Sequence, residues 1–364
     1  MTKTLSPSKY SPKYIITNEI LTNIGRIEAA KEVIENSPLI PSWERDFIKD
    51  AQIRTVHYST HLEGNPLDFP EVKKIIEGFE NEIIAHDRDV YEVINYREVV
   101  QFIEKIFEEA KDANKTSADI IDMDLILKMQ KILSRKILKD DRQGKIREKN
   151  ADLISSKNFE KVLTFPKVDE IRPAIEDFLA WLGSKNSLTT HPVLKAGIAH
   201  YELTRIHPFD DQNGRTARAL STLVLYLDGY NIKSFFSLDE HFDKDPMNYY
   251  NHLASVQKEG GDLTKWLEYF SKSLSIELSR IKDKVLKLSK DAKLKGLVGQ
   301  ISLSERQEGI ITYIQDFGSI NNAKWKKLFP DYSDDTILRD LQDLIKKKII
   351  RKTGKTKSAK YILR

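Results

Sequence analysis

The stretch IHPFDDQNGRTARAL, residues 206–220, decides how the whole 364-residue sequence is interpreted. It places a histidine, two acids, an Asn-Gly step and two arginines close together, where a predicted loop leads into a helix that begins near Asn213. Backbone N–H groups at a helix N-terminus, beside a glycine that permits close approach, are suited to bind phosphate. We therefore expect anion chemistry at this junction.

The side chains of this stretch suit complementary roles in such chemistry. Arg215 and Arg218 are three residues apart, so they share a helix face, and guanidinium groups match phosphate oxygens. Asp210 or Asp211 is suited to hold Mg²⁺, which usually binds one or two carboxylates together with substrate phosphates. His207 is the natural general base, because histidine titrates near neutral pH. The residues alone predict Mg²⁺-assisted chemistry on a phosphate compound.

Residues 207–218 resemble the hallmark of the Fic family (filamentation induced by cAMP), which is H-P-F-x-[D/E]-G-N-G-R-x-x-R. The match holds at every fixed position except Gln212, where the family has glycine. The resemblance implies transfer of AMP from ATP to a hydroxyl side chain of a protein, with pyrophosphate as the leaving group. If position 212 requires a positive φ, glutamine would strain the loop or turn its amide toward a different geometry.

The resemblance also implies a role for each matching residue. His207 would take the proton of the target hydroxyl, and Asp211 would bind Mg²⁺ between the α- and β-phosphates. Residues 213–215 would line the anion hole, Arg218 would hold the γ-phosphate, and a tyrosine pair would contribute to the base pocket. Packing in the core is an alternative role for either tyrosine. The expected ATP contacts are Gln212, Asn213, Gly214, Arg215, Arg218, Tyr249 and Tyr250.

A second motif lies upstream, in YSTHLEGNPLD at residues 58–68. Ser59, Glu63 and Gly64 match [S/T]-x-x-x-E-[G/N], which resembles the inhibitory helix of self-inhibited Fic proteins. The resemblance implies that Glu63 pairs with Arg218 and occupies the guanidinium that should hold the γ-phosphate. An ordinary solvent-facing glutamate at a helix end is the alternative. We call residues 59–64 the inhibitory segment.

The rest of the chain is predicted to be mainly α. Apolar residues recur at three- and four-residue spacing through most of residues 1–280, with a small β-hairpin flap expected at about 150–165. The resemblance to the Fic fold covers roughly residues 144–274, and strand addition to the flap would align a target segment. The predicted organisation is an N-terminal helical region at 1–110, a Fic core at 111–280, a connecting helix at 281–301 and a final unit at 302–364.

The final unit carries most of the basic charge. The last 84 residues hold 20 Lys/Arg and 10 Asp/Glu, and residues 346–364 hold nine Lys/Arg and no acid. Three helical patterns followed by a hairpin resemble a winged helix-turn-helix, with 334–347 as its recognition helix. Such a domain makes DNA an expected partner, and protein docking is the alternative.

The composition excludes several classes of function. With no cysteine, the chain has no disulfide, iron–sulfur cluster, Cys-based zinc site or cysteine nucleophile, which suits a cytoplasmic location. No stretch is apolar enough for a membrane span. We therefore expect an autoinhibited protein AMP-transferase that uses Mg·ATP, modifies a target protein or itself, and is compatible with a homodimer. Transfer of another nucleotide or phosphate moiety, and a DNA-binding regulator with a nucleotide-sensing Fic domain, are the alternatives.

Overall fold

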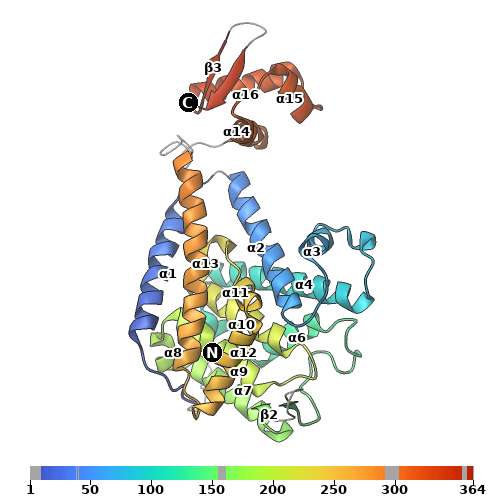
Figure 1. The fold of residues 1–364 in the computed structure, drawn as a ribbon, viewed down its shortest axis with the longest axis vertical. Coiled ribbons are helices and arrows are strands. Elements are labelled where there is room, and N and C mark those ends of the chain that lie inside the picture. Colours follow the sequence, from blue (N-terminus) through green and yellow to red (C-terminus); the bar gives the residue numbers. More distant parts are fainter. Residues whose placement is uncertain are drawn as a thin grey trace. The chain divides into compact units, whose positions relative to one another are not determined.

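The computed structural model describes residues 10–37, 39, 41–154, 161–291, 303–354 and 359–363. The chain divides into two compact units, the first formed by residues 1–31 and 49–279 and the second by 32–48 and 280–364. Three long helices contribute residues to both units: α1 (Asn18–Asn36), α2 (Pro41–His61) and α13 (Thr264–Asp291). Figure 1 shows the order of the elements along the chain.

The first unit is mainly α, as the hydrophobic spacing predicts. Besides parts of α1, α2 and α13, its helices in chain order are α3 (Phe69–Ile76), η1 (Glu80–Glu82), α4 (Asp87–Asp112), α5 (Ser117–Ile120), α6 (Met123–Leu133), α7 (Val168–Leu182), α8 (Lys185–Thr189), α9 (Pro192–Ile206), α10 (Asn213–Leu225), η2 (Tyr226–Tyr230), η3 (Ile232–Ser234), α11 (Asp239–Lys244) and α12 (Pro246–Lys258). The helix predicted to begin near Asn213 corresponds to α10 and is confirmed.

Helices α9 and α10 form the centre of this unit, and α10 also contacts α4 and α6. Pro192 at the first turn and the His191 side chain, which accepts a hydrogen bond from a backbone N–H, begin α9. Nearly every residue of α9 is buried, and a Cβ at Gly197 would lie 2.8 Å from the Leu267 side chain. The Trp266 indole donates to the Gly197 carbonyl (2.8 Å), so α13 and α9 are in close contact. This contact fixes the helix that leads into His207.

The predicted flap is a two-stranded antiparallel hairpin. Strand β1 (Asp152–Ile154) pairs with β2 (Lys161–Thr164), with an irregularity in register after Leu153. Residues 155–160 of the predicted flap lie outside the described residues. The Gln257 side chain of α12 binds the Thr164 backbone at both N–H (3.1 Å) and C=O (2.9 Å), so the second strand is attached to the helical body.

The second unit contains three short helices and a second hairpin around its own apolar cluster. Its elements are α14 (Glu305–Phe317), α15 (Asn322–Leu328), α16 (Asp334–Lys346), β3 (Ile350–Thr353) and β4 (Lys360–Leu363). β3 and β4 are antiparallel, and Ile320 adds a bridge to Tyr361. The buried cluster includes Trp325, Ile337 and Leu341, so α16 packs one apolar face into it. The three predicted helical patterns and the terminal hairpin are confirmed, and α16 ends one residue before the predicted end at 347.

None of the helices in the described part of the chain is long and apolar enough to cross a membrane.

Candidate active site

The loop between α9 and α10 has two residues in the left-handed region. His207 ends α9 with φ 49°, and Gln212 precedes α10 with φ 71°. Position 212 thus has the backbone conformation that favours glycine, and the glutamine adopts it at a cost in strain. The Asn213 amide both accepts from the Phe209 N–H and donates to the Phe209 carbonyl (2.9 Å each), which closes the loop. The Asn213 side chain therefore shapes the loop that leads into α10.

His207 lies in a largely buried setting. Its imidazole stacks on the Phe165 ring, with centroids 4.0 Å apart and an angle of 15° between the planes. Burial lowers the pKa of His207 to about 4, and the nearby positive charge of Arg147 acts in the same direction, whereas Glu63 and Asp211 oppose it. The imidazole is therefore neutral at physiological pH. A neutral imidazole at the end of α9 can accept a proton, as a general base must.

Arg218, on the first turns of α10, is completely enclosed by polar partners. Its Nη1 donates to a Glu63 carboxylate oxygen (2.8 Å), and its Nε and Nη2 donate to the Ser59 hydroxyl and carbonyl (2.9 Å each). Asp239 Oδ1 lies 3.1 Å from Nε. Burial lowers the pKa of Arg218, but the charges of Glu63 and Asp239 outweigh it and leave the pKa raised. Two predicted motifs that are 155 residues apart thus meet at one guanidinium.

Gly214 lies directly against this contact. A Cβ at position 214 would be 2.1 Å from Glu63 Oε1 and 3.2 Å from Arg218 Nη1. The Glu63 carboxylate therefore approaches the N-terminus of α10 more closely than any side chain at position 214 would permit. Gly64, which follows Glu63 in the inhibitory segment, has φ 90° and ends the turn after α2.

The remaining charged motif residues are paired with α4. Arg215 Nη1 lies 2.9 Å from Glu92, which also accepts from the Asn65 amide (3.0 Å). Burial favours a raised pKa for Glu92, but the bond and charge of Arg215 outweigh it and hold the pKa below its usual value. Arg88 Nη2 donates to Asp211 (2.7 Å). Both the predicted anion-hole arginine and the predicted Mg²⁺ ligand thus have partners in this structure.

Asp211 fits a magnesium site of the kind that substrate phosphates complete. Its side chain is 29% exposed, and it offers hard carboxylate oxygens beside the N-terminus of α10. No group of three or more His, Cys, Asp or Glu side chains is arranged to hold a metal within the described residues. A cation here would therefore need oxygens from a bound nucleotide and from water. Asp210, the alternative ligand, pairs instead with Arg142 Nε (2.8 Å).

The two tyrosines differ in their surroundings. Tyr249 is buried, its hydroxyl is 3.1 Å from His200 Nε2, and its ring lies 4.8 Å from that of Phe242. Tyr250 is 38% exposed, and its hydroxyl is 3.4 Å from the Leu62 carbonyl. Tyr249 is thus a member of the aromatic core, whereas Tyr250 retains exposed surface beside the inhibitory segment.

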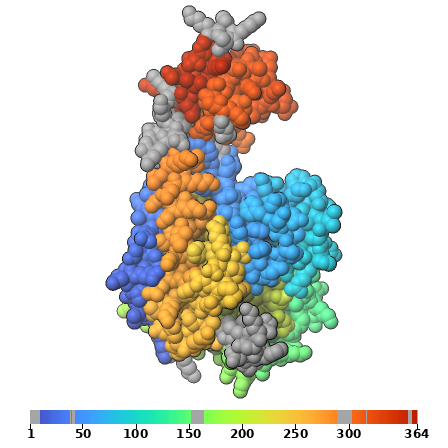
Figure 2. Space-filling model, in the orientation of Figure 1, coloured from blue at the N-terminus to red at the C-terminus, as the bar shows by residue number. Residues whose placement is uncertain are grey.

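The end of α2 is also fixed from α11. His61 Nδ1 lies 2.8 Å from Asp243 of α11. In Figure 2 yellow and blue parts of the surface adjoin. The pair of His61 and Asp243 helps to hold the chain just before Glu63.

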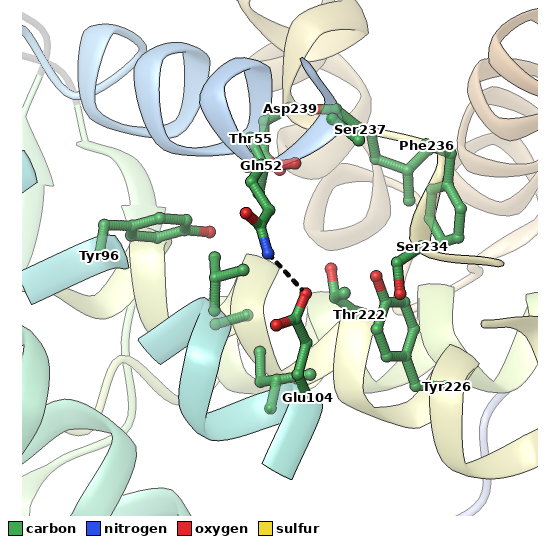
Figure 3. A pocket seen from close by; sticks show the side chains of 15 residues that line it. Gln52, Thr55, Tyr96, Glu104, Thr222, Tyr226, Ser234, Phe236, Ser237 and Asp239 are labelled. Carbon is green, nitrogen blue, oxygen red and sulfur yellow. Dashed lines mark hydrogen bonds between the residues drawn. The ribbon is translucent and has the colours of Figure 1, made fainter. Parts of the chain in front are cut away.

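A small cavity of about 20 Å³ is lined by Asp239, Tyr96 and Ser237, among others (Figure 3). It has room for about one water molecule and none for a nucleotide. Burial raises the pKa of Asp239, an effect that Arg218 opposes. Of the residues that line the cavity, Asp239 is thus the one that pairs with Arg218.

Several site residues were not found from sequence. Arg88 and Glu92 of α4, Asp239 of α11 and Phe165 after β2 contact motif residues, but they come from separate segments with no fixed spacing to the motif. The capping and hydrophobic signals of those segments indicate only secondary structure. Contact across the fold is what identifies them.

Part of this chain is similar in sequence to known proteins. Residues 120–225 match the model of the Fic/DOC family. A protein adenylyltransferase Fic from Nematostella vectensis is 26% identical over 236 residues, which cover 62% of this chain and 47% of that protein. One from Aedes aegypti is 27% identical over 232 residues, covering 61% and 40%. The chain thus spans about half the length of these relatives, or less.

Solved structures agree in fold. A Fic family protein from Desulfovibrio desulfuricans aligns with a TM-score of 0.65 at 20% identity, covering 98% of both chains. Fic-1 from C. elegans aligns with a TM-score of 0.56 at 23% identity, covering 74% of both. Residues 120–225, which hold the motif and the hairpin, thus match the Fic/DOC family, and the chain shares its fold with solved Fic structures.

Proposed function

We propose that this protein transfers AMP from Mg·ATP to a hydroxyl side chain of a protein. The main support for this proposal is that His207 is neutral and largely buried. It begins the loop that leads to the N-terminus of α10, where Gly214 and two arginines lie. Its relatives named adenylyltransferases, which match the chain over part of their length, support this proposal. The proposed acceptor is a hydroxyl of another protein or of this chain itself, since the chemistry requires only a hydroxyl.

In the proposed reaction His207 accepts the proton of the hydroxyl while its oxygen attacks the α-phosphorus. The new O–P bond forms as the bond to the bridging oxygen breaks, and pyrophosphate leaves. Backbone N–H groups at the α10 N-terminus and the Arg215 guanidinium stabilise the developing charge, and Arg218 orients the γ-phosphate. Mg²⁺, when bound by Asp211 and the phosphates, would neutralise phosphate charge.

We further propose that the inhibitory segment suppresses this reaction. The Glu63 carboxylate takes the guanidinium edge of Arg218 that the γ-phosphate would use, and its negative charge would repel that phosphate. A hydrogen bond to a charged group contributes about 1.5–3 kcal/mol. Withdrawal of Glu63 should therefore raise productive ATP binding by about 10- to 100-fold.

The test measures covalent label from ATP carrying ³²P at the α-phosphate. We expect strong labelling of Glu63→Gly, weak labelling of the unmodified protein, and loss of label by about 10²- to 10⁴-fold when His207→Ala is added to Glu63→Gly. Glu82→Gly, which removes an exposed surface glutamate, is the matched control and should behave like the unmodified protein. Equal labelling of Glu63→Gly and the unmodified protein would contradict the inhibitory role.

Nucleotide donors labelled at other positions show whether a group other than AMP is transferred. If label is transferred from ATP labelled at the γ-phosphate, the transferred group is a phosphate and not AMP. If another labelled nucleotide is used in preference to ATP, the transferred group is a different nucleotide moiety. Absence of label from every donor, in self-modification and in a cell lysate, would contradict transferase activity.

Arg88 gives a prediction about metal binding that does not depend on turnover. The Arg88 cation occupies the carboxylate that the metal would use, so Arg88→Ala should tighten Mn²⁺ binding in the presence of a non-hydrolysable ATP analogue. The pair is half exposed, so we expect about a two- to fivefold effect, measured by electron paramagnetic resonance of free Mn²⁺. Arg142→Ala, which frees Asp210 instead, is the control. Equal tightening in both variants would show that the choice of Asp211 is wrong.

A second function is favoured by the charge distribution of the C-terminal unit. Asp340 and Asp343 of α16 face basic partners within the unit (Arg306 at 2.8 Å, Lys347 at 2.7 Å). The exposed positions of α16 and the hairpin carry mainly basic or amide side chains: Arg339, Gln342, Lys346, Arg351, Lys352 and Lys360. We propose that this unit is a winged helix that binds duplex DNA, with α16 in the major groove and the hairpin on phosphates.

Fluorescence anisotropy with a labelled duplex tests this proposal. Affinity should fall steeply between 50 and 200 mM salt, and Arg351→Ala with Lys352→Ala should lower the slope of log K against log[salt] by about 2. Lys105→Ala with Lys128→Ala, on the first unit, is the control for net charge. Absence of binding at 50 mM salt would contradict the proposal and leave docking of a protein as the role of the unit.

A further inference from the structure

The Arg147 side chain is fully buried, and each of its three nitrogens donates to a backbone carbonyl. Nε donates to His207 (2.9 Å), Nη1 to Lys149 (2.7 Å) and Nη2 to Pro166 (2.6 Å). The Arg147 backbone N–H also donates to the Pro208 carbonyl (2.8 Å). A buried cation is costly unless its donors are satisfied, and these carbonyls provide that compensation, so Arg147 is held firmly in place.

The three carbonyls belong to three separate parts of the site. Lys149 precedes β1, Pro166 follows β2, and His207 is the proposed base. One guanidinium therefore joins both ends of the hairpin to the backbone of the base. The planar fork of arginine reaches three directions at once, which the single ammonium of lysine does not.

A second contact joins the same two parts. Phe165, next to Pro166, stacks on the His207 imidazole. The strand that ends just before it is held by Gln257 of α12, the helix that also carries Tyr249 and Tyr250. The end of β2 is thus attached to the base on one side and to the helix beside the expected nucleotide pocket on the other.

We propose that Arg147 and Phe165 are positioning residues that set the distance and orientation between the hairpin and His207. This inference rests on the proposed function. If an extended acceptor segment adds to β2 as a further strand, the hairpin determines the position of its hydroxyl. The position of the base, in contrast, is determined by α9. Arg147 and Phe165 hold the hairpin and His207 in a fixed relative position, so that the acceptor hydroxyl lies next to the imidazole.

The test uses Glu63→Gly as the parent and measures two quantities: the rate of AMP transfer to protein and the Kd for ATP by calorimetry. Arg147→Lys keeps the charge and loses the fork, and Phe165→Ala removes the stacked ring. A misplacement of about 1 Å can cost about 10²-fold in rate, so we expect transfer to fall by about 10²-fold in both variants while the Kd for ATP stays within about threefold. Phe165→Tyr, which keeps the ring, should restore most of the rate.

Phe165 protects the test against misfolding, because its side chain is only partly buried and its removal leaves the buried Arg147 contacts in place. Parental transfer rates in Phe165→Ala and Arg147→Lys would overturn the inference. A loss of ATP affinity in step with the rate would also overturn it, because that result indicates a general structural role. If the Glu63→Gly parent itself transfers no label, the proposed function fails, and this outcome is distinct from either of the others.

Discussion

Arg218→Met in the Glu63→Gly protein is expected to abolish AMP transfer and to destabilise the fold. The guanidinium is the proposed γ-phosphate ligand, and loss of such a charge-stabilising group typically costs about 10²- to 10³-fold in rate. Its removal also leaves the Asp239 carboxylate buried without the cation 3.1 Å away. Breaking a buried pair from one side costs about 3–5 kcal/mol, to be measured by urea denaturation.

A double substitution separates these two losses. Adding Asp239→Asn removes the uncompensated charge, so the free energy of unfolding should recover by most of the amount lost. Transfer should stay abolished, because no group remains to hold the γ-phosphate. If stability and transfer returned together, Arg218 would act only by supporting the fold. If stability did not return, Ser59, which contacts the guanidinium through both its hydroxyl and its carbonyl, would be the more important partner.

The sequence predicted the parts of the site that are contiguous. His207, Gly214, Arg215 and Arg218 lie on one loop and one helix, so their spacing alone fixes which of them share a face. The Glu63–Arg218 contact spans 155 residues and was predicted only because a second motif resembled a known inhibitory segment; the structure confirms that the two side chains meet.

The charged residues that pair with the motif residues could not be predicted from the sequence. Arg88, Glu92 and Asp239 neutralise motif residues, but each lies on a helix whose spacing indicates only which face is buried. Their roles depend on how helices cross, which hydrophobic periodicity does not determine. Gln212 is the reverse case: the sequence raised the question of a positive φ, and the structure answers it with φ 71°.

Gly214→Ala tests whether freeing Arg218 is sufficient for activity. In the unmodified protein the new methyl group would lie 2.1 Å from Glu63 Oε1, so the flexible carboxylate must move away from Arg218. In the proposed mode of ATP binding, the same methyl group would occupy space at the α10 N-terminus that the γ-phosphate needs. We therefore expect Gly214→Ala to weaken the inhibitory contact without raising transfer, in contrast to Glu63→Gly.

The decisive form of this experiment combines Gly214→Ala with Glu63→Gly. The closest remaining contact of the methyl group is then 3.2 Å from Arg218 Nη1, so the melting temperature should stay close to that of Glu63→Gly. Because the phosphate can no longer approach the backbone N–H groups, ATP affinity and label transfer should both fall by about 10²-fold. Gly25→Ala, where a Cβ meets nothing within 4 Å, is the matched control and should transfer as its parent does. Full transfer by the combined variant would place the γ-phosphate away from Gly214, and the contact between Glu63 and Arg218 would then inhibit through charge alone rather than by occupying the phosphate's position.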